Sequence, residues 1–103
     1  MLVLDEPTAS LDVRHEMEIL ELIRSLVDHG LAGLVITHQL NLAARFADRM
    51  LLLNGGRVVA QGTPAEVLRK DILTEVFQWP VAVTAWCDGS PQIVPLRPNE
   101  SPE

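Results

Sequence analysis

The apolar positions of the chain form short runs that alternate with amphipathic segments. Residues 1–4 and "GLVIT", residues 33–37, are short apolar segments of the kind found in strands covered on both faces. Between these segments, hydrophobic residues recur at steps of three and four while charged residues take the other side, which predicts an amphipathic helix. The recurring residues are Val13, Met17, Leu20, Ile23 and Val27.

The boundaries of this helix are marked by residue types that favour helix ends. Asp12 is placed to cap the N-terminus, and Gly30 follows the last periodic residues as a stop. The order strand, helix, strand over this length predicts two parallel strands joined by a right-handed crossover. The fold class is therefore predicted to be α/β, a parallel sheet with flanking helices.

The segment after Thr37 predicts a second helix and then a hairpin. In "HQLNLAARFADR" one helical face is shared by Leu40, Ala43, Ala44 and Ala47. "MLLLNGGRVVAQG" follows as two apolar strands around "NGG", residues 54–56, which supply the positive φ angles that a tight hairpin needs.

The last third of the chain predicts short helices, a second hairpin and a tail. Thr63 and Glu66 form a capping box with Pro64 at the first helical position, so a short helix begins there. A further helix is expected over about 72–77 before Pro80, followed by a strand pair around an Asp-Gly turn. Residues 97–103 are rich in Pro and acidic residues, which predicts a disordered tail.

Composition narrows the classes of protein to which the chain can belong. At 103 residues, with 48% apolar and 21% charged residues, it is expected to form one folded domain. A net charge of -6 and a single lysine, Lys70, argue against binding nucleic acid, and no apolar run is long enough for direct membrane insertion. The one cysteine, Cys87, excludes an internal disulfide, fits a cytoplasmic location and is expected to be a buried, inert thiol.

Candidate chemistry begins at the end of the first strand, where Asp5 and Glu6 are adjacent. Ligands of open α/β sheets bind at the carboxyl ends of strands, and successive strand residues point to opposite sides. One carboxylate can therefore hold a hydrated Mg²⁺ while the other orients and deprotonates an attacking water. The alternative is that both acids are solvated loop residues after a core strand.

The residues around this pair favour the first interpretation. "LVLDEPTASLD" resembles the Walker B motif and D-loop of the ATP-binding cassette (ABC) family, the ATPase subunits of ABC transporters. The resemblance implies that Asp5 is the Mg²⁺-associated aspartate and Glu6 the catalytic glutamate. It also implies that Ser10, Leu11 and Asp12 form the D-loop, which contacts the opposite ATP site of a nucleotide-sandwich dimer; for Asp12 a plain helix cap is a compatible role.

His38 directly follows the second predicted strand, so its side chain should emerge at the same sheet edge as Asp5 and Glu6. A histidine there can simply cap a helix or be partly buried. In register with the family, however, it corresponds to the H-loop histidine, which contacts the γ-phosphate and helps to position the water and Glu6. A histidine can donate a hydrogen bond to developing phosphate charge without being cationic.

The subfamily is indicated by the segment after His38. "HQLNLAARFADRMLLLNGGRVVAQGTPAEVL" is similar to the subunits that drive import of ferric siderophores, haem or cobalamin. Gln39 replaces an aspartate that is frequent there. The resemblance implies ATP and Mg²⁺ as cofactors, a second ATPase subunit in a homodimer, permease transmembrane subunits as partners, and a location on the inner face of the cell membrane.

Several motifs of that family are absent from the sequence. The phosphate loop G-x-x-x-x-G-K-[ST], the Q-loop glutamine and the "LSGGQ" signature do not occur. We therefore expect residues 1–96 to be the C-terminal part of an ABC ATPase domain, with an uncovered apolar sheet edge and face, and no ATP turnover by this chain alone. The alternative is a non-catalytic truncated module that binds a full-length ABC ATPase or permease.

The remaining polar and aromatic candidates carry weaker signals. His15 and His29 lack a third ligand at metal-binding spacing, so a metal site there is not expected. Trp79 and Trp86 are expected to pack at the core or a sheet edge. Arg45 and Arg49 are expected to be solvated or paired with Asp48.

Overall fold

The computed structural model describes residues 1–8 and 10–99, and the chain divides into two compact units. Unit 1 is Met1–Gln39, and unit 2 begins at Leu40. Both combine helices with strands, which confirms the predicted α/β class. Of the predicted disordered tail, residues 100–103 lie outside the described residues.

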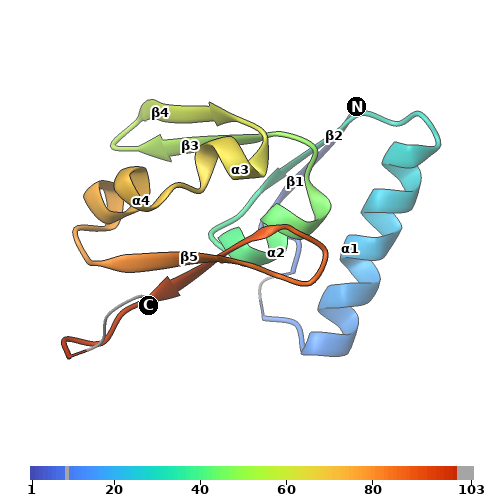
Figure 1. Cartoon of the computed structure of the whole chain (residues 1–103). Helices are drawn as coiled ribbons and strands as arrows, with labels where there is room; N and C mark the ends of the chain where they lie inside the picture. The colour runs from blue at the N-terminus through green and yellow to red at the C-terminus, as the bar shows by residue number, and fades with distance from the viewer. Residues whose placement is uncertain (9, 100–103) are drawn as a thin grey trace. The chain divides into compact units, whose positions relative to one another are not determined.

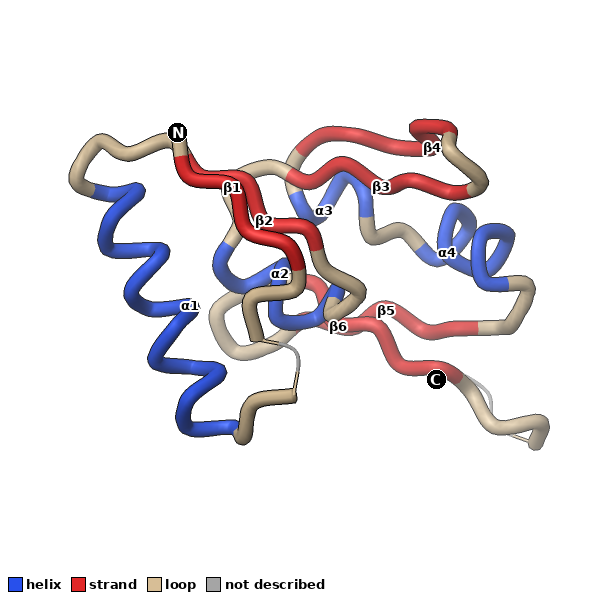
Figure 2. The backbone as a smooth tube through the Cα atoms, turned by 180° about the vertical axis from the view of Figure 1, so that it is seen from behind, coloured by secondary structure: helices blue, strands red, loops and turns tan. Residues whose placement is uncertain are grey.

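Unit 1 is a strand–helix–strand segment. It consists of β1 (Leu2–Asp5), α1 (Val13–Asp28) and β2 (Gly33–Ile36). Figure 2 shows β1 and β2 running side by side, and their pairing is parallel from Leu2 opposite Gly33 to Asp5 opposite Ile36. The parallel strand pair predicted from the two apolar segments is therefore confirmed.

Both ends of α1 follow the local signals in the sequence. At the N-terminus the Oδ1 atom of Asp12 accepts a hydrogen bond from the backbone N–H of His15 at 2.9 Å. At the C-terminus Gly30 has a φ of +106°, a conformation that costs glycine little because it has no Cβ. No helix in the described part of the chain is both long and apolar enough to cross a membrane.

The two faces of the β1–β2 sheet differ in how far they are covered. On one face α1 packs so closely that a Cβ added to Gly33 would lie 3.2 Å from Cγ2 of Val27. On the other face Val3, Leu34 and Ile36 are 53%, 50% and 48% exposed. The expectation of strands covered on both faces is therefore wrong within this chain, whereas the expected uncovered apolar face is present.

Unit 2 opens with a helix and a hairpin. They are α2 (Leu40–Phe46), β3 (Met50–Asn54) and β4 (Arg57–Gly62), and the two strands pair antiparallel. The glycines of "NGG" adopt φ angles of +60° and +79°, as the tight turn requires. The hairpin was therefore predicted correctly, and a register shift between Leu52 and Leu53 interrupts its ladder.

The short helix α3 (Pro64–Val67) is fixed by the predicted capping box. The backbone N–H of Thr63 donates to Oε1 of Glu66 at 2.8 Å, and the N–H of Glu66 donates to Oγ1 of Thr63 at 3.3 Å. A Cβ at Gly62 would lie 2.5 Å from Oε1 of Glu66, so a side chain there would displace the carboxylate that closes this turn.

The chain continues through α4 (Lys70–Phe77) into a second antiparallel hairpin, β5 (Val81–Ala85) and β6 (Pro91–Pro95). Figure 1 shows these elements as the yellow-to-red end of the chain. The helix α4 begins two residues earlier than predicted. Cys87 lies in the turn between β5 and β6 and is exposed, so the prediction of a buried thiol is wrong: a two-stranded hairpin buries its strands and leaves its tip in solvent.

The connected hydrophobic core of the described residues belongs to unit 2. The helices α2, α3 and α4 and both hairpins contribute side chains to it. Its buried members are Ala44, Leu52, Val67, Leu68, Leu73, Val81 and Ile93. In unit 1 the described residues include one buried hydrophobic side chain, Leu20.

Candidate functional site

The two adjacent carboxylates occupy different backbone environments at the end of β1. Asp5 is the last residue of the strand and is exposed. The backbone N–H of Glu6 donates to the carbonyl of Ile36 at 2.7 Å, so hydrogen bonding to the neighbouring strand continues one residue past β1. Glu6 itself has a φ of +51°, a left-handed conformation that costs a residue other than glycine about 1–2 kcal/mol. Non-glycine residues held in this conformation are enriched at functional sites.

The side chain of Glu6 is held by two residues that follow β2. Its Oε1 atom lies 2.5 Å from Nδ1 of His38, and its Oε2 atom accepts a long hydrogen bond of 3.5 Å from Oγ1 of Thr37. The Glu6 side chain is 29% exposed and that of His38 is 96% exposed. The structure therefore brings together Glu6 and His38, two candidate residues that are 32 positions apart in the sequence.

Thr37 is a neighbour of Glu6 that no sequence motif singled out. Its Oγ1 atom accepts a hydrogen bond from the backbone N–H of Gln39 at 3.0 Å while it donates to Glu6. The hydroxyl thus ties the start of the loop after β2 to the candidate base. The sequence signal that could have indicated Thr37 is its position as a hydroxyl residue between the apolar strand and His38.

The proton of the Glu6–His38 hydrogen bond constrains the chemistry of both groups. An ionised carboxylate can only accept, so Nδ1 of His38 carries the shared proton. A neutral imidazole then presents Nε2 as an acceptor, and only the doubly protonated ring can donate from both nitrogens. In this arrangement His38 can donate to a phosphate through Nε2 only as a cation; a neutral ring must first release Glu6.

The three residues matched to the D-loop lie between β1 and α1. Ser10 has a φ of +69°, and the N–H of Leu11 donates to the carbonyl of Thr8 at 3.3 Å. Leu11 is 42% exposed, whereas Thr8 is only 4% exposed. Asp12 acts as the cap of α1, as predicted; its role in a D-loop remains a prediction.

Asp5, the candidate Mg²⁺ residue, is not part of a larger cluster of metal-binding side chains in the described residues. In the described part of the chain no group of three or more His, Cys, Asp or Glu side chains is placed to hold a metal ion. Nδ1 of His15 lies 2.8 Å from Oδ1 of Asp12, and Nδ1 of His29 lies 2.7 Å from the carbonyl of Ser25. A single exposed carboxylate such as Asp5 fits Mg²⁺, which proteins usually hold through one or two carboxylates together with phosphate oxygens and water.

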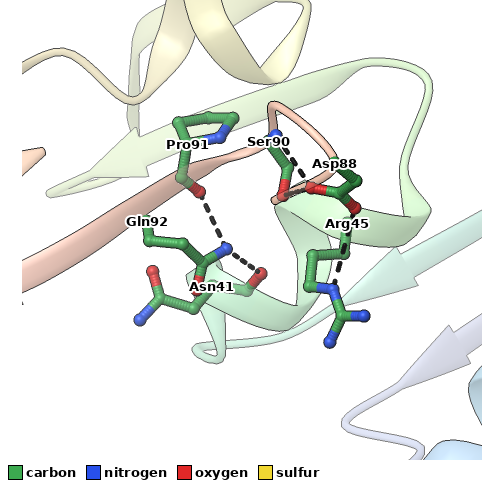
Figure 3. A network of polar contacts seen from close by, with 6 residues as sticks. All are labelled: Asn41, Arg45, Asp88, Ser90, Pro91 and Gln92. Atoms are coloured by element: carbon green, nitrogen blue, oxygen red, sulfur yellow. Dashed lines mark hydrogen bonds and ion pairs between the residues drawn. The ribbon is translucent and has the colours of Figure 1, made fainter. Parts of the chain in front are cut away.

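A second polar cluster lies at the tip of the β5–β6 hairpin in unit 2. Figure 3 marks an ion pair between Arg45 and Asp88, in which Nε lies 3.9 Å from Oδ2. The same guanidinium lies 5.9 Å from the ring centroid of Trp86, within cation–π range. Hydrogen bonds from the side chain and backbone of Ser90 lower the pKa of Asp88, and Arg45 adds to the effect.

The start of α2 is attached to β6 by an asparagine side chain. Oδ1 of Asn41 accepts from the backbone N–H of Ile93 at 2.6 Å, and its Nδ2 donates to the carbonyl of Ile93 at 3.1 Å. The Gln92 side chain donates in turn to the backbone carbonyl of Asn41 at 3.3 Å. Asn41 therefore pairs with β6 as a neighbouring strand residue would, a contact the sequence pattern did not predict.

Comparison with known proteins places these features in a family. No protein-family model matches the chain. It is 45% identical over 95 residues to the hemin import ATP-binding protein HmuV of Rhodopseudomonas palustris strain CGA009, a match that covers 92% of this chain and 35% of that protein. It is 50% identical over 94 residues to the protein of the same name from Pseudomonas fluorescens strain Pf0-1, covering 90% and 37%.

The backbone supports the same relationship. One solved structure, of an ABC transporter described as metal-chelate type in an inward-facing conformation, matches with a TM-score of 0.77 and 29% identity. The match covers 93% of this chain and 39% of that one. The chain thus spans about a third of the length of the curated relatives it matches. Sequence and backbone together show that it is homologous to part of the ATP-binding subunits of ABC transporters.

Proposed function

We propose that this chain is the hydrolytic part of an ATP-binding subunit that drives an ABC importer for haem or a related iron chelate or cobalamin. The contact between Glu6 and His38 carries the proposal. It joins the catalytic glutamate and the H-loop histidine assigned by resemblance, at the carboxyl end of a parallel strand pair where such sheets bind ligands. The names of the relatives, hemin import ATP-binding proteins, favour the substrate class.

Each residue of the site has one chemical task in the proposed reaction. Glu6 accepts a proton from the attacking water, and its left-handed backbone and Thr37 hold its carboxylate at the end of β1. His38 donates to phosphate oxygen through Nε2, either as the cation while Nδ1 keeps the Glu6 contact or as the neutral ring after that contact is released. Ser10, Leu11 and Asp12 face the second subunit of a homodimer.

ATP and Mg²⁺ require groups from outside this chain as well. Asp5 would hold Mg²⁺, which neutralises charge on the transferred phosphate when bound. No glycine-rich phosphate loop with its lysine occurs in the sequence, so the chain by itself is not proposed to hydrolyse ATP. Hydrolysis, docking on permease subunits and a place at the inner face of the membrane belong to the complete subunit.

The test measures ATP hydrolysis by a full-length fusion protein in which Glu6, the proposed general base, is replaced by glutamine. The part of the R. palustris relative outside the match is fused to this chain, and steady-state ATP hydrolysis is measured with Mg²⁺. Glu6→Gln keeps the size of the side chain and removes its basicity, so a loss of about 100-fold or more is expected. Glu21→Gln, the same change at an exposed position on α1, serves as the matched control and should retain the parent rate.

Two results would contradict the proposal. Hydrolysis by the Glu6→Gln fusion near the parent rate removes Glu6 as the base. A parent fusion that folds and binds ATP but does not hydrolyse it favours instead the non-catalytic module that binds a full-length ATPase or permease. Sequencing the DNA upstream of Met1 separates the same alternatives, because an in-frame phosphate loop and signature motif there identify a longer subunit.

A further inference from the structure

Both carboxylate oxygens of Glu6 are engaged by the segment that follows β2. Oε1 lies 2.5 Å from Nδ1 of His38, and Oε2 accepts the 3.5 Å hydrogen bond from Oγ1 of Thr37. The two partners differ in their surroundings, because the His38 side chain is 96% exposed whereas Thr37 is half-buried. An exposed side chain changes rotamer readily, so His38 can leave Glu6 while Thr37 stays in place.

The proton of the Thr37 hydroxyl is committed to Glu6. The backbone N–H of Gln39 donates to Oγ1 of Thr37 at 3.0 Å, and an N–H group cannot accept a hydrogen bond in return. The ionised carboxylate on the other side of the hydroxyl can only accept. Donation therefore runs in one direction, from Gln39 through Thr37 to Oε2 of Glu6. Hydrogen bonds in such a chain strengthen one another.

The backbone joins the same two segments. The N–H of Glu6 donates to the carbonyl of Ile36 at 2.7 Å, and Ile36 directly precedes Thr37. Glu6 and its hydroxyl partner are therefore held together by the main chain as well as by the side-chain contact. At 3.5 Å that contact is long for an O–H···O hydrogen bond, and contacts of catalytic groups commonly tighten only when substrate is bound.

We propose that Thr37 is a positioning residue that gives the two oxygens of Glu6 different tasks. Thr37 holds Oε2, and Oε1 becomes the proton acceptor once a neutral His38 has released it to donate to phosphate. As water gives a proton to Oε1, its oxygen bonds the γ-phosphorus, and the electron pair of the broken phosphorus–oxygen bond leaves with ADP. The inference rests on the proposed function and adds to it the anchor of the base and the identity of its reactive oxygen.

The first test removes the hydroxyl in the full-length fusion described above. Thr37→Val keeps the shape of the side chain and should lower kcat for ATP hydrolysis about tenfold or more, because the base is no longer held in place. KM for ATP should stay within about twofold, since Thr37 is not proposed to contact the nucleotide. Thr37→Ser retains the hydroxyl and should restore most of the rate. Thr84→Val, the same change at an exposed threonine of β5, is the matched control and should retain the parent rate.

A double-variant cycle separates positioning from a general loss of structure. If Thr37 acts through Glu6, adding Thr37→Val to Glu6→Gln should change the remaining rate less than about twofold, because the base is already absent. An equal loss in both backgrounds would overturn the proposal. A Thr37→Val fusion with the parent kcat, or a Thr37→Ser fusion no more active than Thr37→Val, would overturn it as well.

A second readout does not require hydrolysis. Nitrogen NMR of the fusion without nucleotide, with the His38 signal identified by its loss in His38→Gln, reports which ring nitrogen is protonated. A neutral His38 bonded to Glu6 carries the proton on Nδ1. Thr37→Val should lower the population with a protonated Nδ1 about twofold or more, because the carboxylate loses the bond that fixes Oε2, whereas Thr37→Ser should not.

The NMR result separates this proposal from the proposed function. A population unchanged by Thr37→Val overturns the role of Thr37, whether or not the fusion hydrolyses ATP. A fusion that binds ATP without hydrolysing it, while the protonation of His38 responds to Thr37→Val as expected, contradicts the proposed function and not the anchoring of Glu6 by Thr37.

Discussion

Unit 1 carries every residue of the candidate site, whereas unit 2 carries eight of the nine buried hydrophobic residues in the described chain. The Glu6–His38 contact is formed on a two-stranded sheet with one helix and one buried leucine. Unit 2 has two hairpins, three helices and a connected core, but none of the candidate catalytic groups. The geometry of a site and the burial that stabilises a fold can therefore reside in different parts of a chain.

The difference between the units has a direct energetic consequence. An isolated two-stranded sheet is marginal in water, since it buries too little apolar surface to offset its loss of conformational entropy. Unit 1 therefore depends on additional layers to hold its site, while unit 2 has more of the burial that independent stability requires.

The largest effect is expected at the centre of the core of unit 2. Leu73 of α4 is fully buried, so Leu73→Ala should lower the free energy of unfolding by about 2–5 kcal/mol. Leu22→Ala on α1 is the matched control, and because Leu22 is 56% exposed its effect should stay within about 0.5 kcal/mol. Urea unfolding followed by circular dichroism measures both. Equal effects of the two variants would mean that the core of unit 2 does not dominate stability.

A smaller effect is expected from the asparagine that holds α2 to β6. Asn41→Ala leaves the N–H and carbonyl of Ile93 without their side-chain partners and should cost about 1–3 kcal/mol. Hydrogen exchange should accelerate at the amide of Ile93 and remain unchanged in β1 and β2. Asn99→Ala, at an exposed asparagine beyond β6, is the control. If the Ile93 amide exchanges as slowly in Asn41→Ala as in the parent, the hydrogen bond between Asn41 and Ile93 is contradicted.

The smallest expected effect is a loss of folding stability at acidic pH. The pKa of Glu66 is lowered by hydrogen bonds from Thr63, and that of Asp88 by hydrogen bonds from Ser90. Because both folded pKa values lie below their unfolded values, the stability they contribute is present above the ordinary carboxyl range of about pH 4 to 4.5 and is lost as the pH falls below it. Thermal melts from pH 6 to pH 3 should show this loss.

Two substitutions assign the acid effect to these groups. Glu66→Gln preserves the capping box but removes the titration, and Asp88→Asn removes the other carboxyl. Each should flatten the dependence of the melting temperature on pH below about 4.5, and the double variant should flatten it further. A slope identical to that of the parent would exclude unit 2 as the source of the acid sensitivity.

The features that could be predicted from sequence depend on neighbours in the chain. The cap at Asp12, the capping box of Thr63 and the glycine turn of the β3–β4 hairpin each involve residues within a few positions. The meeting of Glu6 and His38 was also predictable, because parallel strands bring their carboxyl ends to one edge. Local capping and turn residues, together with two apolar strands in parallel order, are sufficient to predict these arrangements.

The features that could not be predicted depend on tertiary packing. Arg45 meets Asp88 and Trp86 only because the second hairpin folds back onto α2, and Asn41 reaches Ile93 across 52 positions. The left-handed backbone of Glu6 carries no residue signature, since glutamate is not a residue that favours it. The exposure of Cys87 follows from its place at a hairpin tip rather than from its residue type.

The positions of the two tryptophans determine what spectroscopy can observe in this protein. Trp86 lies under Arg45, and the indole N–H of Trp79 donates to the carbonyl of Leu96 at 2.7 Å, so both belong to unit 2. The chain has no tyrosine, and unit 1 contains no aromatic Phe, Trp or Tyr at all. Intrinsic fluorescence therefore follows unit 2 and is silent about the candidate site. Unit 1 has no phenylalanine that could be replaced conservatively by tryptophan. Folding of the candidate site must therefore be followed with an extrinsic dye or with a tryptophan introduced into α1.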